Sequence, residues 1–188
     1  VDSGAATRVS LATSTLIFES LDIDGDGFPD ILYGLNAANT EYDVSLLKAV
    51  DGLKETTSSP VTATSVSSIN GIIADLNNDG FLDIFIANYD ADGNEAYLGT
   101  DTGEWRAVEL TGLLKGPATI DAELNIGHTM SVITADFNSD GKADLFLCNR
   151  KNESSLLIQG DTRPGLDSFM ALPLPEPLSG IDNCSATL

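Results

Sequence analysis

Short runs of apolar residues recur along the chain, and clusters of glycine, asparagine, aspartate and proline separate them. Runs such as those at 71–74, 83–86 and 144–147 are rich in β-branched or aromatic residues, which is typical of buried strands. No stretch shows the 3.6-residue apolar period of a long amphipathic helix. The pattern therefore predicts an all-β protein.

The strands are arranged around three copies of one acidic nine-residue segment, at 22–30, 75–83 and 136–144. An apolar run lies before and after the second and third copies, so each copy is expected to be the turn of a hairpin. Weaker strand patterns follow the copies at 42–49, 94–98, 105–110, 155–159 and 169–172. About four short strands per unit at this spacing predict blades of four antiparallel strands, as in a β-propeller. The units fall at roughly 13–60, 61–115 and 125–175 of a single region, 1–188.

Each acidic segment has oxygen-bearing side chains at its positions 1, 3, 5 and 9 and a glycine at position 6. Clustered carboxylates without a basic partner repel one another unless a cation lies among them. Hard oxygen ligands in a flexible loop suit calcium, and the glycine lets the backbone turn so that residue 7 can offer its carbonyl oxygen. The sequence therefore predicts a calcium-binding protein.

An EF-hand is the competing interpretation of these loops, because its first five positions are similar. An EF-hand requires a bidentate glutamate at position 12 and flanking helices. Position 12 is Tyr33, Ile86 and Leu147 in the three copies, and the flanking segments have strand patterns. The spacing therefore favours a calcium loop within a β-hairpin.

The stretches 21–33, 74–88 and 135–149 resemble the FG-GAP/VCBS repeats of integrin-α-type β-propellers. The resemblance implies one calcium ion between the first two strands of each of three blades. The implied side-chain ligands are Asp22, Asp24, Asp26, Asp30, Asp75, Asn77, Asp79, Asp83, Asp136, Asn138, Asp140 and Asp144. The implied carbonyl ligands are those of Phe28, Phe81 and Lys142. Asn77 and Asn138 replace an acid at position 3, so these two sites are expected to be weaker than the first.

The net charge of −20 is strongly acidic, and the three loops supply ten of the acidic residues. This charge disfavours nucleic acid or an anionic membrane as a partner, and no run of about 20 apolar residues predicts a membrane span. Millimolar calcium outside cells would fill such loops, which favours an extracellular or cell-surface setting. Two sequons, at Asn152 and Asn183, agree with that setting and would make the chain a glycoprotein.

Several other residues leave alternatives open. Cys148 and Cys184 can form a disulfide, or Cys148 can be a buried free thiol. The only histidine, His128, lies in no recognisable catalytic arrangement. Four aromatic residues, Phe81, Tyr89, Tyr97 and Trp105, are expected to pack within blades, with a sugar-stacking surface as the alternative. The longest departure from the repeat, 111–129, is the expected place for specific contacts.

The expected function is a non-enzymatic adhesion or interaction scaffold for protein or glycan, in which calcium is structural. One alternative is a subunit of a surface filament that assembles with itself, and another is a part of a polysaccharide-acting enzyme. Segments 7–12 and 179–188 are expected to contribute to neighbouring blades, as in an excerpt of a longer propeller. Fold alone does not decide among these functions.

Overall fold

The structure, a computed structural model, describes residues 15–23, 25, 27–36, 42–47, 68–89, 93–108, 129–149, 156–159 and 170–173. Within these residues the secondary structure consists of β-strands without a helix, which confirms the all-β prediction. The strands are β1 (Thr15–Leu21), β2 (Asp30–Asn36), β3 (Tyr42–Leu47), β4 (Ser68–Ala74), β5 (Asp83–Asn88), β6 (Glu95–Gly99), β7 (Trp105–Val108), β8 (Thr129–Ala135), β9 (Asp144–Asn149), β10 (Leu156–Gln159) and β11 (Met170–Pro173).

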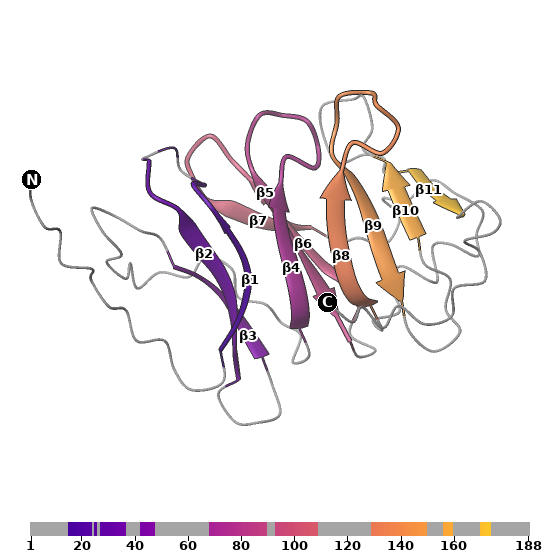
Figure 1. Ribbon diagram of the computed structural model, residues 1–188. Coiled ribbons are helices and arrows are strands. Elements are labelled where there is room, and N and C mark those ends of the chain that lie inside the picture. The colour runs from indigo at the N-terminus through magenta and orange to yellow at the C-terminus, as the bar shows by residue number, and fades with distance from the viewer. Residues whose placement is uncertain are drawn as a thin grey trace, which may run out of the picture.

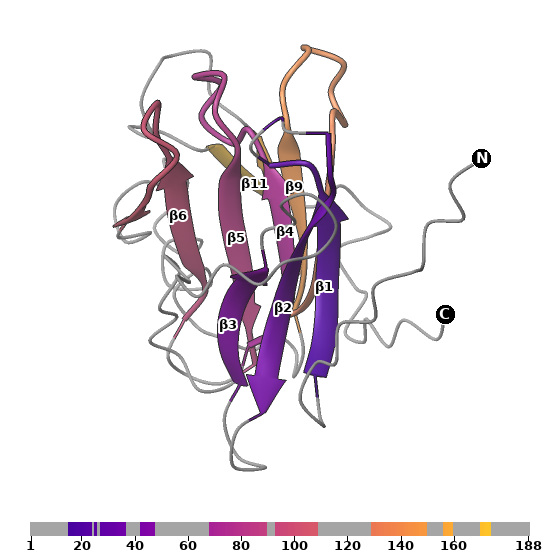
Figure 2. The same ribbon diagram turned by 90° about the vertical axis from the view of Figure 1, so that its left-hand side faces the viewer.

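The strands form three antiparallel sheets in chain order (Figure 1). The first sheet has the order β1-β2-β3 in the described residues, and the second and third have four strands each, β4-β5-β6-β7 and β8-β9-β10-β11. The first strands of the three sheets, β1, β4 and β8, lie side by side. Viewed from the side of the first sheet, β3 forms its far edge, away from β1 (Figure 2). The sheets therefore meet through their first strands as well as through the faces described below.

The acidic segments are the turns of the first hairpin in each sheet. The last strand pairs before the turns are Leu21 with Asp30, Ala74 with Asp83 and Ala135 with Asp144. Position 9 of each segment therefore pairs with the residue that precedes position 1. All three turns lie at the same edge of the molecule (Figure 1).

Two apolar clusters hold the sheets together. Leu32 of the first sheet packs with Ile73, Ile84, Ile86 and Tyr97 of the second. Residues on the opposite face of the second sheet, including Ile72 and Phe85, pack with Val132, Leu145 and Leu147 of the third. Adjacent residues in a strand face opposite sides, so Ile72 and Ile73 serve different clusters. Strand β5 is buried along its whole length because it lies between both neighbours.

Side chains also join the first strands, whose backbones are not paired with one another in a sheet. The backbone N–H of Ile73 in β4 donates to the Glu19 carboxylate in β1. The N–H of Val132 in β8 donates to Oδ1 of Asn70 in β4, at 3.1 Å. These bonds satisfy edge N–H groups that would otherwise lose their partners on burial.

A buried polar network joins the second and third sheets at the end opposite to the acidic turns. Asn94 Nδ2 donates to Thr129 Oγ1 at 2.9 Å, and Thr129 Oγ1 donates to Asn149 Oδ1 at 2.8 Å. The Asn88 N–H donates to Asn94 Oδ1 at 3.0 Å. Because a buried polar group is costly when it is left unpaired, this network fixes how the two sheets align.

Candidate metal-binding loops

The second loop, 75–83, folds around its own polar side chains. The Asp79 N–H lies 3.1 Å from Asp75 Oδ1 and 3.0 Å from Asn77 Oδ1, so the oxygens of positions 1 and 3 converge on one donor. Asp75 Oδ2 accepts from the Gly80 N–H at 3.0 Å. Asp79 Oδ2 accepts from Asn77 Nδ2 at 2.8 Å. Positions 1, 3 and 5 are therefore brought together.

The third loop, 136–144, repeats this arrangement. The Asp140 N–H lies 2.9 Å from Asp136 Oδ1 and 2.8 Å from Asn138 Oδ1. The Gly141 N–H donates to Asp136 Oδ2, and Asn138 Nδ2 donates to Asp140 Oδ2. The two segments thus adopt one geometry, because they have the same residues at positions 1, 3, 5, 6 and 9.

The backbone explains the glycine at position 6. Gly27, Gly80 and Gly141 have φ of 90°, 93° and 87°, a region that side chains disfavour. Position 4 is also left-handed in the second and third loops, with φ of 59° at Asn78 and 61° at Ser139. Two left-handed residues make the turn tight enough for the side chains to converge.

The aspartate at position 9 is more deeply buried than the predicted ligands at positions 1 and 5. Asp30, Asp83 and Asp144 are each fully buried, whereas positions 1 and 5 lie toward solvent in the second and third loops. Asp83 Oδ2 accepts from the N–H groups of Leu76 and Asn77 at 2.8 and 3.3 Å, and its Oδ1 accepts from the Gly99 N–H at 2.9 Å.

The other two loops share part of this pattern. Asp144 Oδ2 accepts from the N–H of Phe137 at 2.9 Å, and Asp30 Oδ2 accepts from the N–H of Ile23 at 3.0 Å. Position 9 therefore closes the loop onto the sheet, a structural role that the sequence analysis did not identify.

Burial raises the pKa of the Asp83 carboxyl to about 6, although its three N–H partners favour the charged form. The desolvation effect is the largest, because this carboxyl has no basic side chain among its hydrogen-bond partners. A nearby cation would favour the charged form.

In the first loop, the side chain of position 1 also accepts backbone N–H groups of its own loop. Asp22 accepts from the N–H groups of Gly25 and Gly27, each at 2.9 Å. Its positions 3 and 5, Asp24 and Asp26, lie outside the described residues.

The donor types in the loops fit a hard cation, since they offer carboxylate and amide oxygens that converge at positions 1, 3 and 5. Among the described residues, however, no three acidic, histidine or cysteine side chains are close enough to form a metal cluster. Asp83 and Asp144 point to the backbone instead. Asp83 uses three acceptor sites in this way, and a carboxylate has about four.

Position 7 differs among the loops. Phe28 and Phe81 are 40% and 39% exposed, respectively. In the third loop the Lys142 ammonium lies 3.8 Å from Asp140 Oδ2, is buried, and makes no hydrogen bond. The third loop therefore holds a positive charge beside its position 5, which the second loop lacks.

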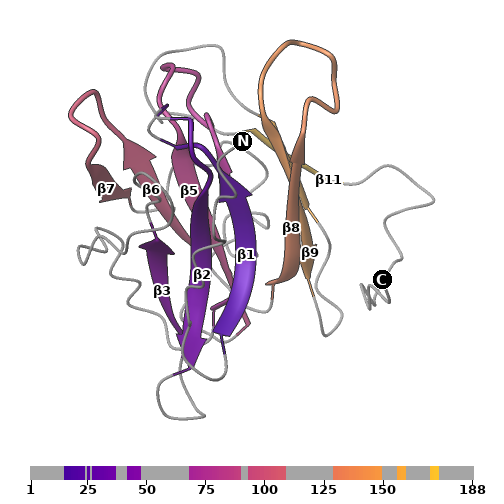
Figure 3. The same ribbon diagram turned by 60° about the vertical axis from the view of Figure 1, so that its left-hand side comes forward.

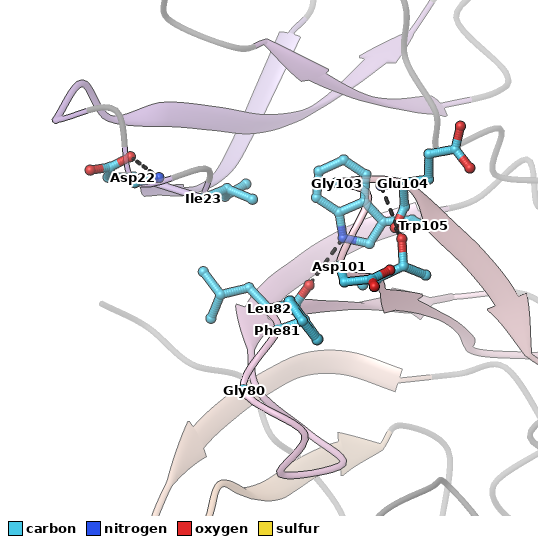
Figure 4. Close-up of a pocket in the computed structure, with 12 residues that line it drawn as sticks. Asp22, Ile23, Gly80, Phe81, Leu82, Asp101, Gly103, Glu104 and Trp105 are labelled. Atoms are coloured by element: carbon cyan, nitrogen blue, oxygen red, sulfur yellow. Dashed lines mark hydrogen bonds between the residues drawn. The ribbon is translucent and has the colours of Figure 1, made fainter.

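A cavity of about 440 Å³ opens between the first loop, the second loop and the β6–β7 turn (Figure 4). The β6–β7 turn reaches the same edge of the molecule as the acidic loops (Figure 3). The lining residues are Asp22, Ile23, Gly25, Gly80, Phe81, Leu82, Gly99, Thr100, Asp101, Gly103, Glu104 and Trp105. Phe81 and Trp105 were candidates from the sequence, whereas Asp101 and Glu104 were not, because only the fold brings this turn next to the loops.

The four aromatic residues considered above separate into different environments. Tyr97 is buried, and its hydroxyl donates to Glu95 Oε2 at 2.5 Å. Burial, together with Glu95, raises the Tyr97 pKa. Trp105 packs against the cluster between the first two sheets and also lines the cavity, as does Phe81. Tyr89 is half-buried and does not line it.

Cys148 is disulfide-bonded, which decides between the two alternatives for this residue. No helix among the described residues is long and apolar enough to cross a membrane. Several predictions fall outside the described residues: they concern Cys184, His128, Asn152, Asn183, and the segments 7–12, 111–128 and 179–188.

Comparison with protein families agrees with the repeated loop. The family described as FG-GAP-like repeat matches the chain over residues 22–86 and again over residues 75–147. A comparison with curated proteins finds no match. The two family matches overlap at the second loop. Together they run from the first loop into β9 and span more than half of the 188 residues. The chain belongs to the FG-GAP-like repeat family.

Proposed function

We propose that this protein is a calcium-stabilised interaction scaffold whose sheets are blades of a β-propeller. The observation that carries the proposal is the shared geometry of the second and third loops, in which the oxygens of positions 1 and 3 converge on a single N–H. A cation that replaced this single donor would neutralise the carboxylate repulsion within each turn.

The groups that would hold calcium are the side chains at positions 1, 3 and 5, the carbonyl oxygen of position 7, and the carboxylate of position 9. Calcium supplies a divalent positive charge that accepts several oxygen ligands at once. The buried position 9 keeps the loop closed through backbone N–H groups, so the fold prepares the loop before a cation arrives. The role of the ion is then to stabilise the folded state by binding to it preferentially.

Exposed apolar residues on the third sheet support the propeller arrangement. On the second sheet, Ile72 and Leu76 lie three residues before and one residue after position 1, and the third sheet buries both. Their counterparts on the third sheet, Ile133 and Phe137, are 52% and 45% exposed. The same positions are apolar on both sheets, which supports a further blade that covers the third sheet as the third covers the second.

The proposed setting is extracellular or at a cell surface, with a protein or glycan ligand and no catalytic role. The net charge of −20 supports partners other than nucleic acid. Nine lysine and arginine residues, spread along 188 positions, give little basis for a catalytic groove that acts on acidic polysaccharides. Calcium available outside cells would keep the loops loaded.

Thermal unfolding in calcium, in magnesium and in chelator tests the calcium role. Calcium should raise the melting temperature markedly and magnesium should restore it poorly, since magnesium demands a tight octahedral shell. The Asp79→Ala and Asp140→Ala variants should each lose part of the calcium-dependent increase, whereas Asp43→Asn, in β3, should retain all of it. Identical melting curves in calcium and chelator would refute the proposal.

Self-assembly is a second candidate, and the exposed Ile133 and Phe137 favour it, since a second copy could cover this face. Sedimentation at several protein concentrations separates the two arrangements. A single species at all concentrations favours a further blade within one propeller. Growth of the particle with concentration, abolished by Ile133→Asp, favours assembly between copies.

A further inference from the structure

The cavity between the first two loops and the β6–β7 turn is lined by acidic and aromatic side chains, and none of its lining residues that the structure describes is a lysine or arginine. We propose that this cavity binds an arginine side chain presented by a partner protein. The inference rests on the proposed interaction role and names the chemistry that the partner must offer.

More than half of the described residues that line the cavity use their backbone N–H groups within the protein. Seven of its twelve lining residues donate their N–H to an oxygen of the chain: Ile23, Gly25, Gly80, Phe81, Gly99, Gly103 and Glu104. A ligand that must accept hydrogen bonds finds these groups already occupied.

The side-chain donors of the cavity are also engaged. Trp105 Nε1 donates to the Leu82 carbonyl oxygen at 3.1 Å, as Figure 4 shows. The Thr100 hydroxyl lies 2.9 Å from both the Glu104 carbonyl oxygen and Thr102 Oγ1, and it accepts from the Glu104 N–H at 3.2 Å. Within the described part of the lining, no other side chain carries a donor, since the rest are glycine, aliphatic, phenylalanine or carboxylate residues.

The available acceptors are carboxylates. Asp101 and Glu104 are exposed, and no hydrogen bond or ion pair engages either carboxylate within the described part of the chain. Asp22 differs from them, because each of its oxygens already accepts a backbone N–H. Arg106 lines a neighbouring cavity together with Asp101 and does not line this one.

The cavity also has an aromatic wall. The hydrogen bond from Trp105 to Leu82 fixes the indole ring, and Phe81 is 39% exposed beside it. Figure 4 shows the Asp101 carboxylate beneath the indole. A cation against an aromatic face gains about 0.5–1 kcal/mol at an exposed site.

These features select arginine among the groups that a partner can present. Arginine carries five N–H donors, has no acceptor, and has a planar guanidinium that stacks on aromatic rings while it binds carboxylates. A neutral sugar must accept as well as donate hydrogen bonds, and the occupied donors serve it poorly. An anionic ligand is repelled by the net charge of −20, which in turn attracts basic partners over long range.

Tryptophan fluorescence tests the inference directly, because Trp105 is the only tryptophan in the chain. The protein, in saturating calcium, is titrated with a blocked glycine–arginine–glycine peptide and with the same peptide carrying citrulline. Citrulline has the shape of arginine without its charge. The arginine peptide should change the emission saturably, and the citrulline peptide should bind at least about tenfold more weakly.

Single-charge variants assign the effect to the cavity. Asp101→Asn and Glu104→Gln should each weaken binding of the arginine peptide about three- to tenfold. Asp43→Asn is the matched control, since Asp43 pairs with Leu35, toward the end of the first sheet that is far from the loops. Equal effects of all three variants would overturn the inference.

Two further outcomes would also overturn it: equal binding of the arginine and citrulline peptides, or a saturable response to a neutral oligosaccharide with none to arginine. These measurements are independent of calcium stabilisation. A calcium-dependent melting temperature with no arginine response would sink this inference alone, whereas an arginine response in a protein indifferent to calcium would sink the calcium proposal alone.

Discussion

Asp83→Ala should destabilise the protein with or without calcium, whereas Asp79→Ala should destabilise it only in calcium, although both residues belong to the same acidic loop. Asp83, at position 9, is fully buried and accepts three backbone N–H groups, from Leu76, Asn77 and Gly99. Asp79, at position 5, is exposed. We expect Asp83 to hold the loop in place without metal and Asp79 to act mainly through calcium.

The magnitude follows from the N–H groups that alanine would leave unpaired. Each buried donor without a partner costs about 1–3 kcal/mol, so three would cost about 3–9 kcal/mol if none found water. Removal of a poorly solvated carboxylate, whose pKa burial raises to about 6, offsets part of that cost. We therefore expect Asp83→Ala to lower the free energy of unfolding by about 2–5 kcal/mol in chelator. Asp79→Ala should change it by about 0.5 kcal/mol or less.

Urea unfolding, followed by the fluorescence of Trp105, measures both variants in chelator and in calcium. Asp79→Ala should match the parent protein in chelator and fall below it only when calcium is present. Asp83→Ala should be less stable in both. If Asp79→Ala were as unstable as Asp83→Ala in chelator, or if Asp83→Ala matched the parent there, the structural role assigned to position 9 would be wrong.

Three other predictions concern single contacts. Lys142→Ala should raise the calcium affinity of the third loop about 3–10-fold by calorimetry, because the ammonium beside Asp140 competes with a cation; an unchanged affinity would contradict this. Burial raises the pKa of Glu19, so its charged form is disfavoured in the folded state and its contribution to stability is lost as pH rises from its ordinary value of 4.5 through the folded pKa. Glu19→Gln should therefore gain stability over the parent at pH 7 and lose that advantage near pH 4 in chemical denaturation; an equal difference at both pH values would exclude this explanation. Gly99→Ala should destabilise the fold by about 1–3 kcal/mol, since its Cβ would lie 2.3 Å from the Leu82 carbonyl oxygen, and a melting temperature equal to that of the parent would show that the backbone yields freely.

The sequence was sufficient for features that depend on near neighbours in the chain. Short apolar runs rich in β-branched or aromatic residues predicted the hairpin strands on both sides of the second and third loops, which β4, β5, β8 and β9 confirm. The glycine at position 6 predicted a tight turn, and its positive φ in all three loops confirms it. Backbone conformation and the composition of short segments are local properties, so a single sequence carries them.

The closure of each loop was beyond the sequence, because it depends on burial. Positions 5 and 9 are both aspartate in the second loop, yet only Asp83 lies in the core, where the Gly99 N–H reaches it from β6. Which carboxylate is buried follows from the pairing of position 9 with the preceding strand and from the cover that the rest of the sheet provides.

Only the tertiary structure decided how the units meet. Glu19 bonds to the backbone of β4, 54 residues away along the chain, and Asn70 bonds to β8 at a separation of 62. The cavity likewise joins Asp101 and Glu104 to loops that begin at Asp22 and Asp75. Within one unit the spacing of residues fixes the hairpin and its loop. Between units the contacts depend on which faces of the sheets are apolar and how they pack, and no spacing in the sequence records that packing.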